Sequence, residues 1–271
     1  MFLTVDNERH AKMAVDSAAE SEAGPRLIVK TRAESPELRR AAQAVEQAAW
    51  NDLGFLNYTR SHYDYYGELL DFFPDFQLCL VEEGSNYPVA VANSVPIRCD
   101  DPEKLPQEGW DWAVAHAAMH HGEGANTLCA LAVSVPSINR KLGYARIMIR
   151  ALNDLARAKG LNGPVVPVRP SSKAKHPQTS IEDYLAWSDD KGRPYDPWIR
   201  SHLACGARIV RPCKKSMVVE EPLAFWETWS NRRFAQSGAY ELDGALAPVA
   251  IDLEKQVGRY EEPNVWVAYP A

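Results

Sequence analysis

A short apolar run that leads through a basic turn into a long helix limits the folds open to this chain. Residues 127–135 read TLCALAVSV and are almost wholly apolar, which is typical of a buried strand. Residues 137–160, SINRKLGYARIMIRALNDLARAKG, start with two cations and a glycine and continue with apolar side chains at helical spacing. A purely structural turn needs no cations, whereas a turn that binds a phosphate uses them.

The turn combines positive charge with small residues, in the pattern [Q/R]-x-x-G-x-[G/A] over residues 140–145. The first N–H groups of a helix lack partners, and the helix dipole favours an anion there. Gly143 lets the backbone approach a ligand, while Arg140 and Lys141 can contact phosphate oxygens. A surface turn with two solvated cations is the alternative. The sequence has no GxxxxGK[ST] and no three-glycine fingerprint, so it predicts neither a P-loop nor a Rossmann site.

Composition excludes several other classes of protein. The 271 residues carry a formal net charge of −6, which argues against a general nucleic-acid binder. Five scattered cysteines without CxxC spacing predict neither a disulfide scaffold nor a zinc site. The N-terminus lacks the apolar core of a secretory signal, and no apolar run reaches the ~18 residues that cross a membrane. We therefore expect a cytoplasmic protein without a nucleic-acid or membrane partner.

The chain as a whole reads as one mixed α/β domain with peripheral additions. We expect a flexible leader over 1–25, the domain over 26–230 with an insertion over 98–126, and a C-terminal extension over 231–271 that packs on the domain. The expected elements are strands at 26–31, 127–135 and 163–170, a hairpin at 76–97, helices at 35–50, 110–121, 144–159 and 196–206, and a last strand pair formed by 207–213 and 216–221.

These segments resemble the GNAT superfamily of acyl-CoA-dependent N-acyltransferases. The resemblance covers roughly residues 26–220 and is carried by LAVSVPSINRKLGYARIMIRAL, by the hairpin before it, and by GPVVPVRP followed by PWIRSHLACGARIV. The segment YEEPNVWVAY is also similar to a GNAT-like subgroup of bacterial proteins. The resemblance implies an α/β fold with a mixed, mostly antiparallel central sheet whose fourth and fifth strands splay apart, flanked by helices.

The resemblance also implies a coenzyme A thioester, acetyl-CoA or a longer acyl-CoA, as co-substrate, and no metal. In GNAT proteins this turn holds the pyrophosphate, and the fourth strand pairs with the pantetheine arm through its backbone. Pro164 and Pro167 suit a fifth strand that leaves its neighbour, because proline cannot donate a ladder hydrogen bond. The implied cofactor residues are Leu131, Val133, Val135, Arg140, Lys141, Leu142, Gly143, Tyr144 and Ala145, and the amides near Leu131 to Val133 would stabilise the oxyanion.

His202 is the candidate for proton transfer. Many GNAT enzymes use a tyrosine four residues before the glycine that ends the fourth helix, and His202 holds that position before Gly206. An imidazole can act as acid or base near neutral pH. The alternative is a half-buried structural histidine. His116 and His120 lie one helical turn apart, but no third metal ligand is identifiable, so we expect no metal site there.

Two regions are candidates for the acceptor side. An aromatic group falls near the early helices that shape this side in GNAT proteins, and the 98–126 insertion offers a mixed apolar and hydrogen-bonding helix. An aromatic core and a decorative surface loop are the respective alternatives. The residues concerned are Trp50, Tyr58, Tyr63, Tyr65 and Tyr66 in the first region, and Trp110, Trp112, His116 and His120 in the second.

The sequence thus predicts an acyltransferase of the GNAT type. It would move an acyl group from a coenzyme A or carrier-protein thioester to the amine of a small molecule, with a homodimer as an open option. A non-catalytic sensor or partner module that binds acyl-CoA is the alternative, because the usual tyrosine is absent. Turnover of an acyl-CoA with a panel of amines separates the two.

Overall fold

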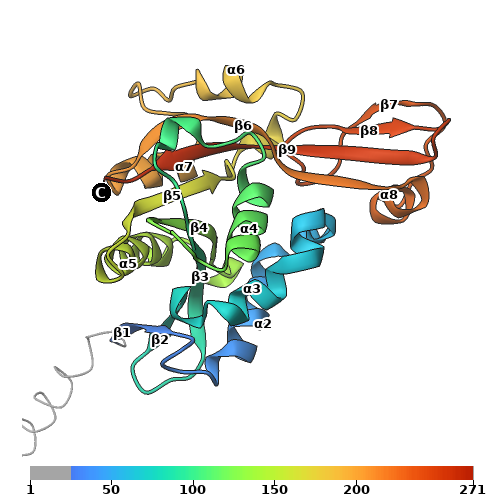
Figure 1. The fold of residues 1–271 in the computed structure, drawn as a ribbon. Helices are drawn as coiled ribbons and strands as arrows, with labels where there is room; N and C mark the ends of the chain where they lie inside the picture. Colours follow the sequence, from blue (N-terminus) through green and yellow to red (C-terminus); the bar gives the residue numbers. More distant parts are fainter. Residues whose placement is uncertain (1–25, 271) are drawn as a thin grey trace, which may run out of the picture.

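A single nine-stranded sheet forms the centre of the molecule (Figure 1). The computed structural model describes residues 26 to 270, so the leader expected over 1–25 lies outside the described residues. Only β4 and β5 run parallel, and every other neighbouring pair is antiparallel. The order is β1-β2-β3-β4-β5-β9-β8-β7, with β6 paired to β9. This confirms the predicted mixed, mostly antiparallel sheet. The strands are β1 (Leu27–Thr31), β2 (Gln77–Glu82), β3 (Pro88–Ile97), β4 (Thr127–Ser134), β5 (Asn162–Val168), β6 (Arg208–Pro222), β7 (Gly238–Tyr240), β8 (Val249–Asp252) and β9 (Val257–Ala268).

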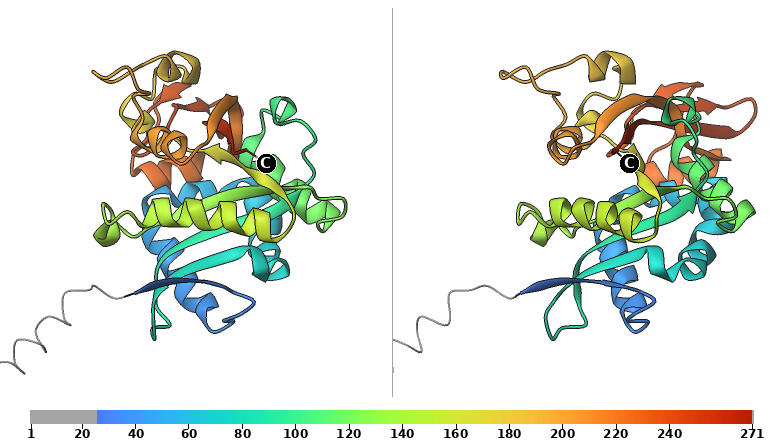
Figure 2. Two further views of the ribbon diagram at one scale, coloured as in Figure 1. Left: turned by 90° about the vertical axis from the view of Figure 1, so that its left-hand side faces the viewer. Right: turned by 60° about the vertical axis from the view of Figure 1, so that its left-hand side comes forward.

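Helices cover both faces of the sheet, as the views in Figure 2 show. The apolar stripe of α5 (Tyr144–Ala158) includes Met148 and Leu152, which pack with Leu80 and Ala92 on one face, called here the α5 face. The opposite face, called here the α4 face, is covered by α2 (Leu38–Trp50), η1 (Asn51–Tyr58), η2 (His62–Tyr66), α3 (Gly67–Phe72) and α4 (Gly109–His120). The shorter helices α6 (Ile181–Leu185) and α7 (Pro197–Ala204) pack on the α5 face, and α8 (Leu223–Ser230) follows β6.

The parallel strands β4 and β5 separate soon after they begin. Their register includes only the pairs Thr127 with Asn162 and Cys129 with Val165. On its other edge, β5 pairs with β9 from Val165, opposite Ala268, to Val168, opposite Val265. The edge of β4 from Ala130 onwards therefore has no strand partner on the β5 side. This is the splay of the fourth and fifth strands that the family resemblance implies.

The predicted last strand pair is wrong, because residues 208–222 form one continuous strand, β6. The residues read as a turn instead make an irregularity between Cys213 and Met217 in the pairing with β9. The 98–126 segment holds this irregularity, since Gln107 accepts hydrogen bonds from the N–H groups of Lys214 and Lys215. The partner of β6 is β9, near the C-terminus of the chain, which lies between β5 and β6.

The distal halves of β6 and β9 extend with β7, β8 and α8 to one end of the molecule (Figure 1). Trp226 of α8 is fully buried, and its indole Nε1 donates to the Gly258 carbonyl at 2.8 Å. Phe55 of η1 packs against Trp226 and Tyr260, with ring centroids 6.2 and 5.3 Å away. The extension is thus fixed to the early helices through its aromatic side chains.

Candidate active site

The basic turn (residues 137–143) leaves its backbone open at the start of α5. Lys141 and Gly143 both have positive φ angles, 76° and 82°. A Cβ atom added at Gly143 would meet nothing within 4 Å, so a ligand can reach the backbone there. Asn139 fixes the turn to the sheet, because its side-chain amide donates to the Val89 carbonyl at 3.0 Å. The turn is therefore fixed to the sheet at Asn139 and open to a ligand at Gly143.

Four backbone N–H groups of residues 140–145, where the turn leads into α5, have no hydrogen-bond acceptor among residues 26–270. The Arg146 N–H is the first in α5 that is satisfied, by the Gly143 carbonyl at 3.0 Å. Unpartnered N–H groups at the positive end of a helix form a site for an anion. The four groups belong to Lys141, Gly143, Tyr144 and Ala145.

The cations around this turn are also free. Arg140 and Lys141 are exposed, as are Arg146 and Arg150 on the first turns of α5. None of the four forms an ion pair within the described part of the chain. Leu142 is 58% exposed, so it contributes no packing to the core. The turn therefore offers positive charge and backbone donors together, as a phosphate site requires.

The open edge of β4 begins next to this turn. Leu131 is buried on the α4 face, whereas Val133 and Val135 pack towards the α5 face. The Leu131 carbonyl accepts a hydrogen bond from the indole Nε1 of Trp110, on α4, at 3.0 Å. The structure thus brings the predicted β4 residues and the basic turn to one place, where β4 has left β5.

A buried polar cluster lies beside this edge on the α4 face. The Oε1 atom of Glu46, on α2, accepts from Arg32 at 2.5 Å and from the amide of Asn93 at 2.8 Å. The same amide nitrogen of Asn93 lies 2.8 Å from the Tyr66 hydroxyl. Burial, and then the Glu46 charge, raise the pKa of Tyr66 above its usual range. Because Asn93 lies directly opposite Ala132 in the β3–β4 register, the cluster adjoins the open part of β4.

The early aromatic residues divide between this face and the surface. The Trp50 indole donates to the Ser134 hydroxyl of β4 at 2.7 Å, and Tyr66 joins the polar cluster. Tyr63 is 79% exposed, and Tyr58 packs instead on Phe225 at 4.7 Å. Tyr65 packs with Tyr66 against the core of the α4 face, so the prediction that early aromatic residues line the acceptor side is kept for Trp50, Tyr65 and Tyr66.

A second group of charges lies on the same face, under α4 and along β9. Glu262 is fully buried and pairs with Arg169 at 2.9 Å. The Oδ2 atom of Asp111 accepts from the Val218 N–H at 2.9 Å, while its buried Oδ1 has no partner in the described chain. Burial, with a smaller contribution from the Glu262 charge, raises the pKa of Asp111 to about 6. Sequence reasoning missed these carboxylates, because single acidic residues in apolar segments carry no motif.

His202 lies on the other face of the sheet. It is buried on α7, its ring centroid is 4.5 Å from that of Trp198, and its Nδ1 atom is 2.9 Å from the Tyr269 hydroxyl. Its Nε2 atom is buried without a partner in the described chain. Burial lowers the pKa of His202 to about 4, so the ring is neutral at physiological pH. A neutral ring with one unpartnered nitrogen can still donate or accept a single proton.

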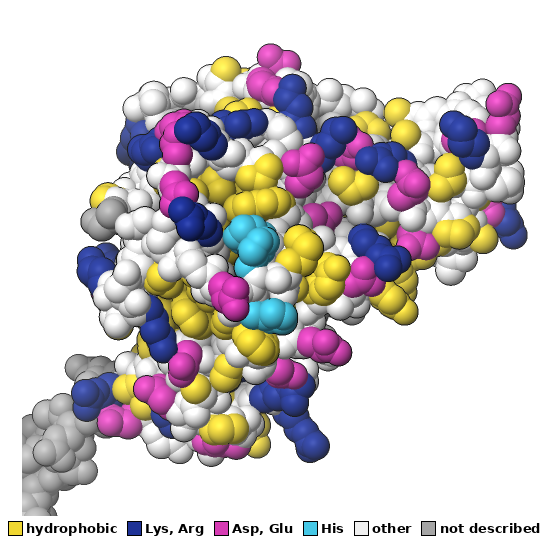
Figure 3. Space-filling model, in the orientation of Figure 1, with side chains coloured by type: hydrophobic (Ala, Val, Ile, Leu, Met, Phe, Trp, Pro, Cys, Tyr) yellow, Lys and Arg dark blue, Asp and Glu magenta, His cyan; other side chains and the backbone are white. Residues whose placement is uncertain are grey.

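The histidines of α4 form a surface feature instead. The ring centroids of His116 and His120 are 4.2 Å apart, and histidine side chains gather with apolar ones over α4 in Figure 3. Within residues 26–270, no three His, Cys, Asp or Glu side chains converge as metal ligands do. On the buried side of the helix, Trp110 and Val114 belong to the core. The 98–126 segment is therefore part of the fold and not a surface decoration.

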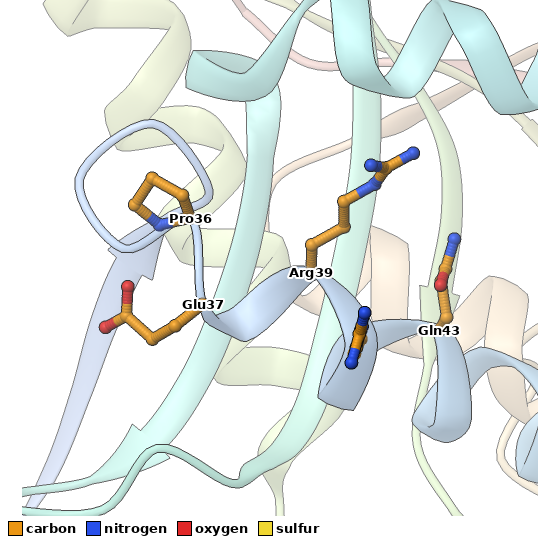
Figure 4. A pocket seen from close by; sticks show the side chains of 5 residues that line it. Pro36, Glu37, Arg39 and Gln43 are labelled. Atoms are coloured by element: carbon orange, nitrogen blue, oxygen red, sulfur yellow. The ribbon is translucent and has the colours of Figure 1, made fainter.

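Two surface hollows lie along α2. One, of about 560 Å³, is lined by Pro36, Glu37, Arg39, Arg40 and Gln43, and Figure 4 shows Glu37 and Arg39 pointing in different directions. The other, of about 280 Å³, is lined by Ala41, Ala44, Val45, Ala48, Tyr87, Pro88 and Pro136. The first combines side chains that do not converge on one point, so we assign no ligand to it.

None of the described helices has the length and apolar character needed to cross a bilayer.

Comparisons with known proteins agree with this geometry. No protein-family model matches the sequence. The arginine N-acetyltransferase avaD of Aspergillus versicolor is 34% identical over 244 residues, covering 80% of this chain and 84% of that protein. The loading GNATL domain of CurA from Lyngbya majuscula superposes with a TM-score of 0.55 at 18% identity, over 90% of this chain and 98% of that domain. The GphF GNAT-like decarboxylase in complex with isobutyryl-CoA gives a TM-score of 0.51 at 17% identity, over 90% and 98%.

The fold and the site define an acyl-CoA-dependent acyltransferase. The similarity to a curated N-acetyltransferase over most of both chains shows that this chain belongs to the GNAT superfamily, as the sequence predicts. It is an N-acyltransferase of the GNAT type. This finding favours the enzyme over the non-catalytic module that the sequence left open. The relative is fungal, so the comparison gives no support to the expected bacterial affinity.

Proposed function

We propose that this protein transfers an acyl group from coenzyme A to the amine of a small cationic molecule, with arginine as the first acceptor to test. The donor half of the proposal is supported by the basic turn. Its unpartnered N–H groups and unpaired cations suit the pyrophosphate, and the open edge of β4 suits the amide-bearing pantetheine arm.

The acceptor half rests on one observation, the excess of carboxylates on the α4 face. Arg32 compensates Glu46 and Arg169 compensates Glu262, but Asp111 forms no ion pair with any residue from 26 to 270. Asp111 and Glu262 lie close enough to repel each other, and a bound cation relieves that repulsion. An amine with a second positive group, such as a guanidinium, supplies this cation. The similar protein of Aspergillus versicolor is named for arginine, which agrees with this choice.

The reaction needs a polarised carbonyl, a proton for the leaving thiolate and a neutral amine. The amine nitrogen attacks the thioester carbonyl carbon, whose oxygen gains negative charge that the amides of Leu131 to Val133 would stabilise. The carbon–sulfur bond then breaks, and the proton that the attacking nitrogen loses passes to the leaving thiolate, with His202 as our candidate to carry it. The acceptor enters as an ammonium and must first lose a proton. Solvent takes this proton, which leaves Asp111 to pair with the second positive group of the acceptor.

Steady-state turnover of acetyl-CoA by the purified full-length protein tests the proposal. The panel contains arginine, lysine, a neutral primary amine and glutamate, and the readouts are thiol release and product mass. We expect arginine to give the highest kcat/KM and glutamate the lowest. Binding of coenzyme A without turnover of any amine would overturn the enzymatic proposal, and a preference for glutamate would overturn the cationic acceptor.

A further inference from the structure

An extra residue interrupts β4 at the point where it faces the gap to β5. In the β3–β4 register, Asn93 lies opposite Ala132 and Ser94 opposite Ala130, which leaves Leu131 without a partner in β3. An inserted residue of this kind is a β-bulge. It also changes which face the side chains point to, since Leu131 packs on the α4 face and Val133 on the α5 face. Without a bulge, residues two apart would share a face.

A bulge leaves backbone groups outside the ladder, and a buried carbonyl needs another donor. Leu131 is 7% exposed, and the donor to its carbonyl is the indole Nε1 of Trp110 at 3.0 Å. Trp110 is itself 6% exposed. The bulge is therefore fixed by a side chain from the 98–126 segment, which the family resemblance does not account for.

The helix that carries Trp110 is fixed to the far side of the gap. The backbone N–H of Trp110 donates to the Ser216 hydroxyl of β6 at 2.9 Å. Gly109 permits this approach, because a Cβ atom there would lie 2.3 Å from the Ser216 hydroxyl oxygen. The same hydroxyl accepts from the Asn264 amide of β9 at 2.8 Å. Trp110 thus links the bulge of β4 to the strands beyond the gap.

The bulge matters for chemistry because it sets the orientation of the backbone beyond it. A shift of one residue reverses the direction of every group that follows in a strand. The amides of Leu131 to Val133 lie where β4 has left β5, so their direction decides whether they point at a ligand in the gap. A single hydrogen bond to the bulge therefore controls the groups that would contact the thioester.

We infer that Trp110 is a positioning residue: its indole N–H holds the β4 bulge so that the following amides polarise the thioester carbonyl. This inference rests on the proposed function. Trp110 also packs by its ring, with centroids 5.1 Å from Tyr66 and 5.9 Å from His62. The two contributions are separable, because only the N–H reaches Leu131.

The experiment removes this N–H and keeps the ring. 3-Benzothienylalanine, which replaces the indole N–H by sulfur, is incorporated at position 110 of the full-length protein. The control carries the same residue at position 226, where another buried indole donates to a carbonyl, that of Gly258 at 2.8 Å, outside the site. We expect kcat to fall ~10- to 100-fold at position 110, the scale of a displaced oxyanion donor, with coenzyme A affinity as in the parent. At position 226 kcat should stay parental.

A spectroscopic readout distinguishes positioning from packing. The infrared carbonyl stretch of bound, carbonyl-labelled acetyl-CoA should be lowered in the parent and should return towards its solution value in the position-110 variant. Equal kcat values in both variants, or an unmoved carbonyl stretch, would contradict the inference. So would loss of coenzyme A binding together with activity, since the hydrogen bond would then serve the fold. A parent protein without turnover of any amine would instead overturn the proposed function itself.

Discussion

The basic turn and the α4 face differ in how their charges are held. At the turn, Arg140 and Lys141 are exposed and without ion pairs in the described chain, and a contiguous stretch supplies all the donors. On the α4 face, the charges are largely buried and mostly paired, and they come from α2, α4 and β9 and from the residues that follow β1 and β5. A free cation keeps its full attraction for an incoming phosphate. A buried pair instead fixes the shape of a pocket and leaves only its excess charge to a ligand.

The basic turn and the α4 face would therefore have different roles. The turn would bind a common feature of every coenzyme A thioester, and the α4 face would select the amine. Substitutions at the turn should therefore change donor affinity alike for all acceptors. Substitutions on the α4 face should change discrimination between acceptors and leave donor affinity intact.

The largest effect is expected for the substitution Gly143→Glu, and it concerns the affinity for coenzyme A. The new side chain and its negative charge would occupy the anion site, and like-charge contact costs several kcal/mol, so we expect coenzyme A affinity to fall ~100-fold or more. The rise in melting temperature with added coenzyme A should disappear.

Gly160→Glu is the matched control for this substitution. Gly160 also has a positive φ angle, 66°, and open surroundings, but it lies at the other end of α5. Both substitutions strain the backbone alike, so only the Gly143 variant should lose binding. Equal melting shifts in the two variants would remove the anion site from the turn.

The second-largest effect is expected for the substitution His202→Gln, and it concerns kcat. If the imidazole supplies the proton to the leaving thiolate, kcat should fall ~10²-fold, while coenzyme A affinity stays parental. Tyr269→Phe removes the hydroxyl that lies 2.9 Å from Nδ1 and should have a smaller effect. Stopped-flow thiol release measures both. A parental kcat in the glutamine variant would leave His202 with a structural role only.

A smaller effect is expected for Asp111→Asn. The amide keeps the shape but removes the excess charge, so the KM for arginine should rise ~10-fold, as for loss of one charge-assisted hydrogen bond. The KM for a neutral amine should change less. Asp100→Asn, an exposed carboxylate in the same segment, is the control and should leave both constants unchanged. Equal losses for arginine and the neutral amine would contradict a role in selection.

The smallest effect concerns the stability of the same variant at different pH. The folded pKa of Asp111 is raised to about 6, so the native state holds a proton that the unfolded state releases near pH 4. The stability that this proton contributes is present below pH 4 and is lost as pH rises through 6. Relative to Asp111→Asn, the parent should therefore lose ~2 kcal/mol between pH 4 and 7. Urea unfolding at both pH values measures this, and a constant difference would contradict it.

The basic turn and its place between a strand and a helix could be predicted from the sequence because they are local. Gly143 and its neighbours carry a short pattern, and the positions before and after it read as strand and helix. The partner of β6 could not be predicted, because the segment around Cys213 to Met217 looks like a turn and its true neighbour, β9, is distant in sequence. Pairing between strands that are distant in the sequence produces no local sequence pattern.

The acidic residues of the α4 face were missed for the same reason, although Trp110 and Tyr66 were among the predicted acceptor-side residues. Glu46 lies on the polar side of a helical pattern and reads as a solvated charge, until β3 brings Asn93 against it. Trp110 and Asp111 lie in a segment that no family pattern covers. One signal was present, since Asn93 interrupts an otherwise apolar strand, VAVANSVPI, and a buried amide must find polar partners.

A crystal structure with a bisubstrate analogue, coenzyme A joined through an acetyl bridge to the α-amine of arginine, tests most directly whether the two regions serve one reaction. Our account predicts that the pyrophosphate accepts hydrogen bonds from the N–H groups of Gly143 to Ala145, and that the bridging carbonyl lies beside Leu131 to Val133. The guanidinium should lie on the α4 face, against Asp111. A pyrophosphate bound away from the turn, or a guanidinium that contacts no carboxylate of that face, would contradict the account.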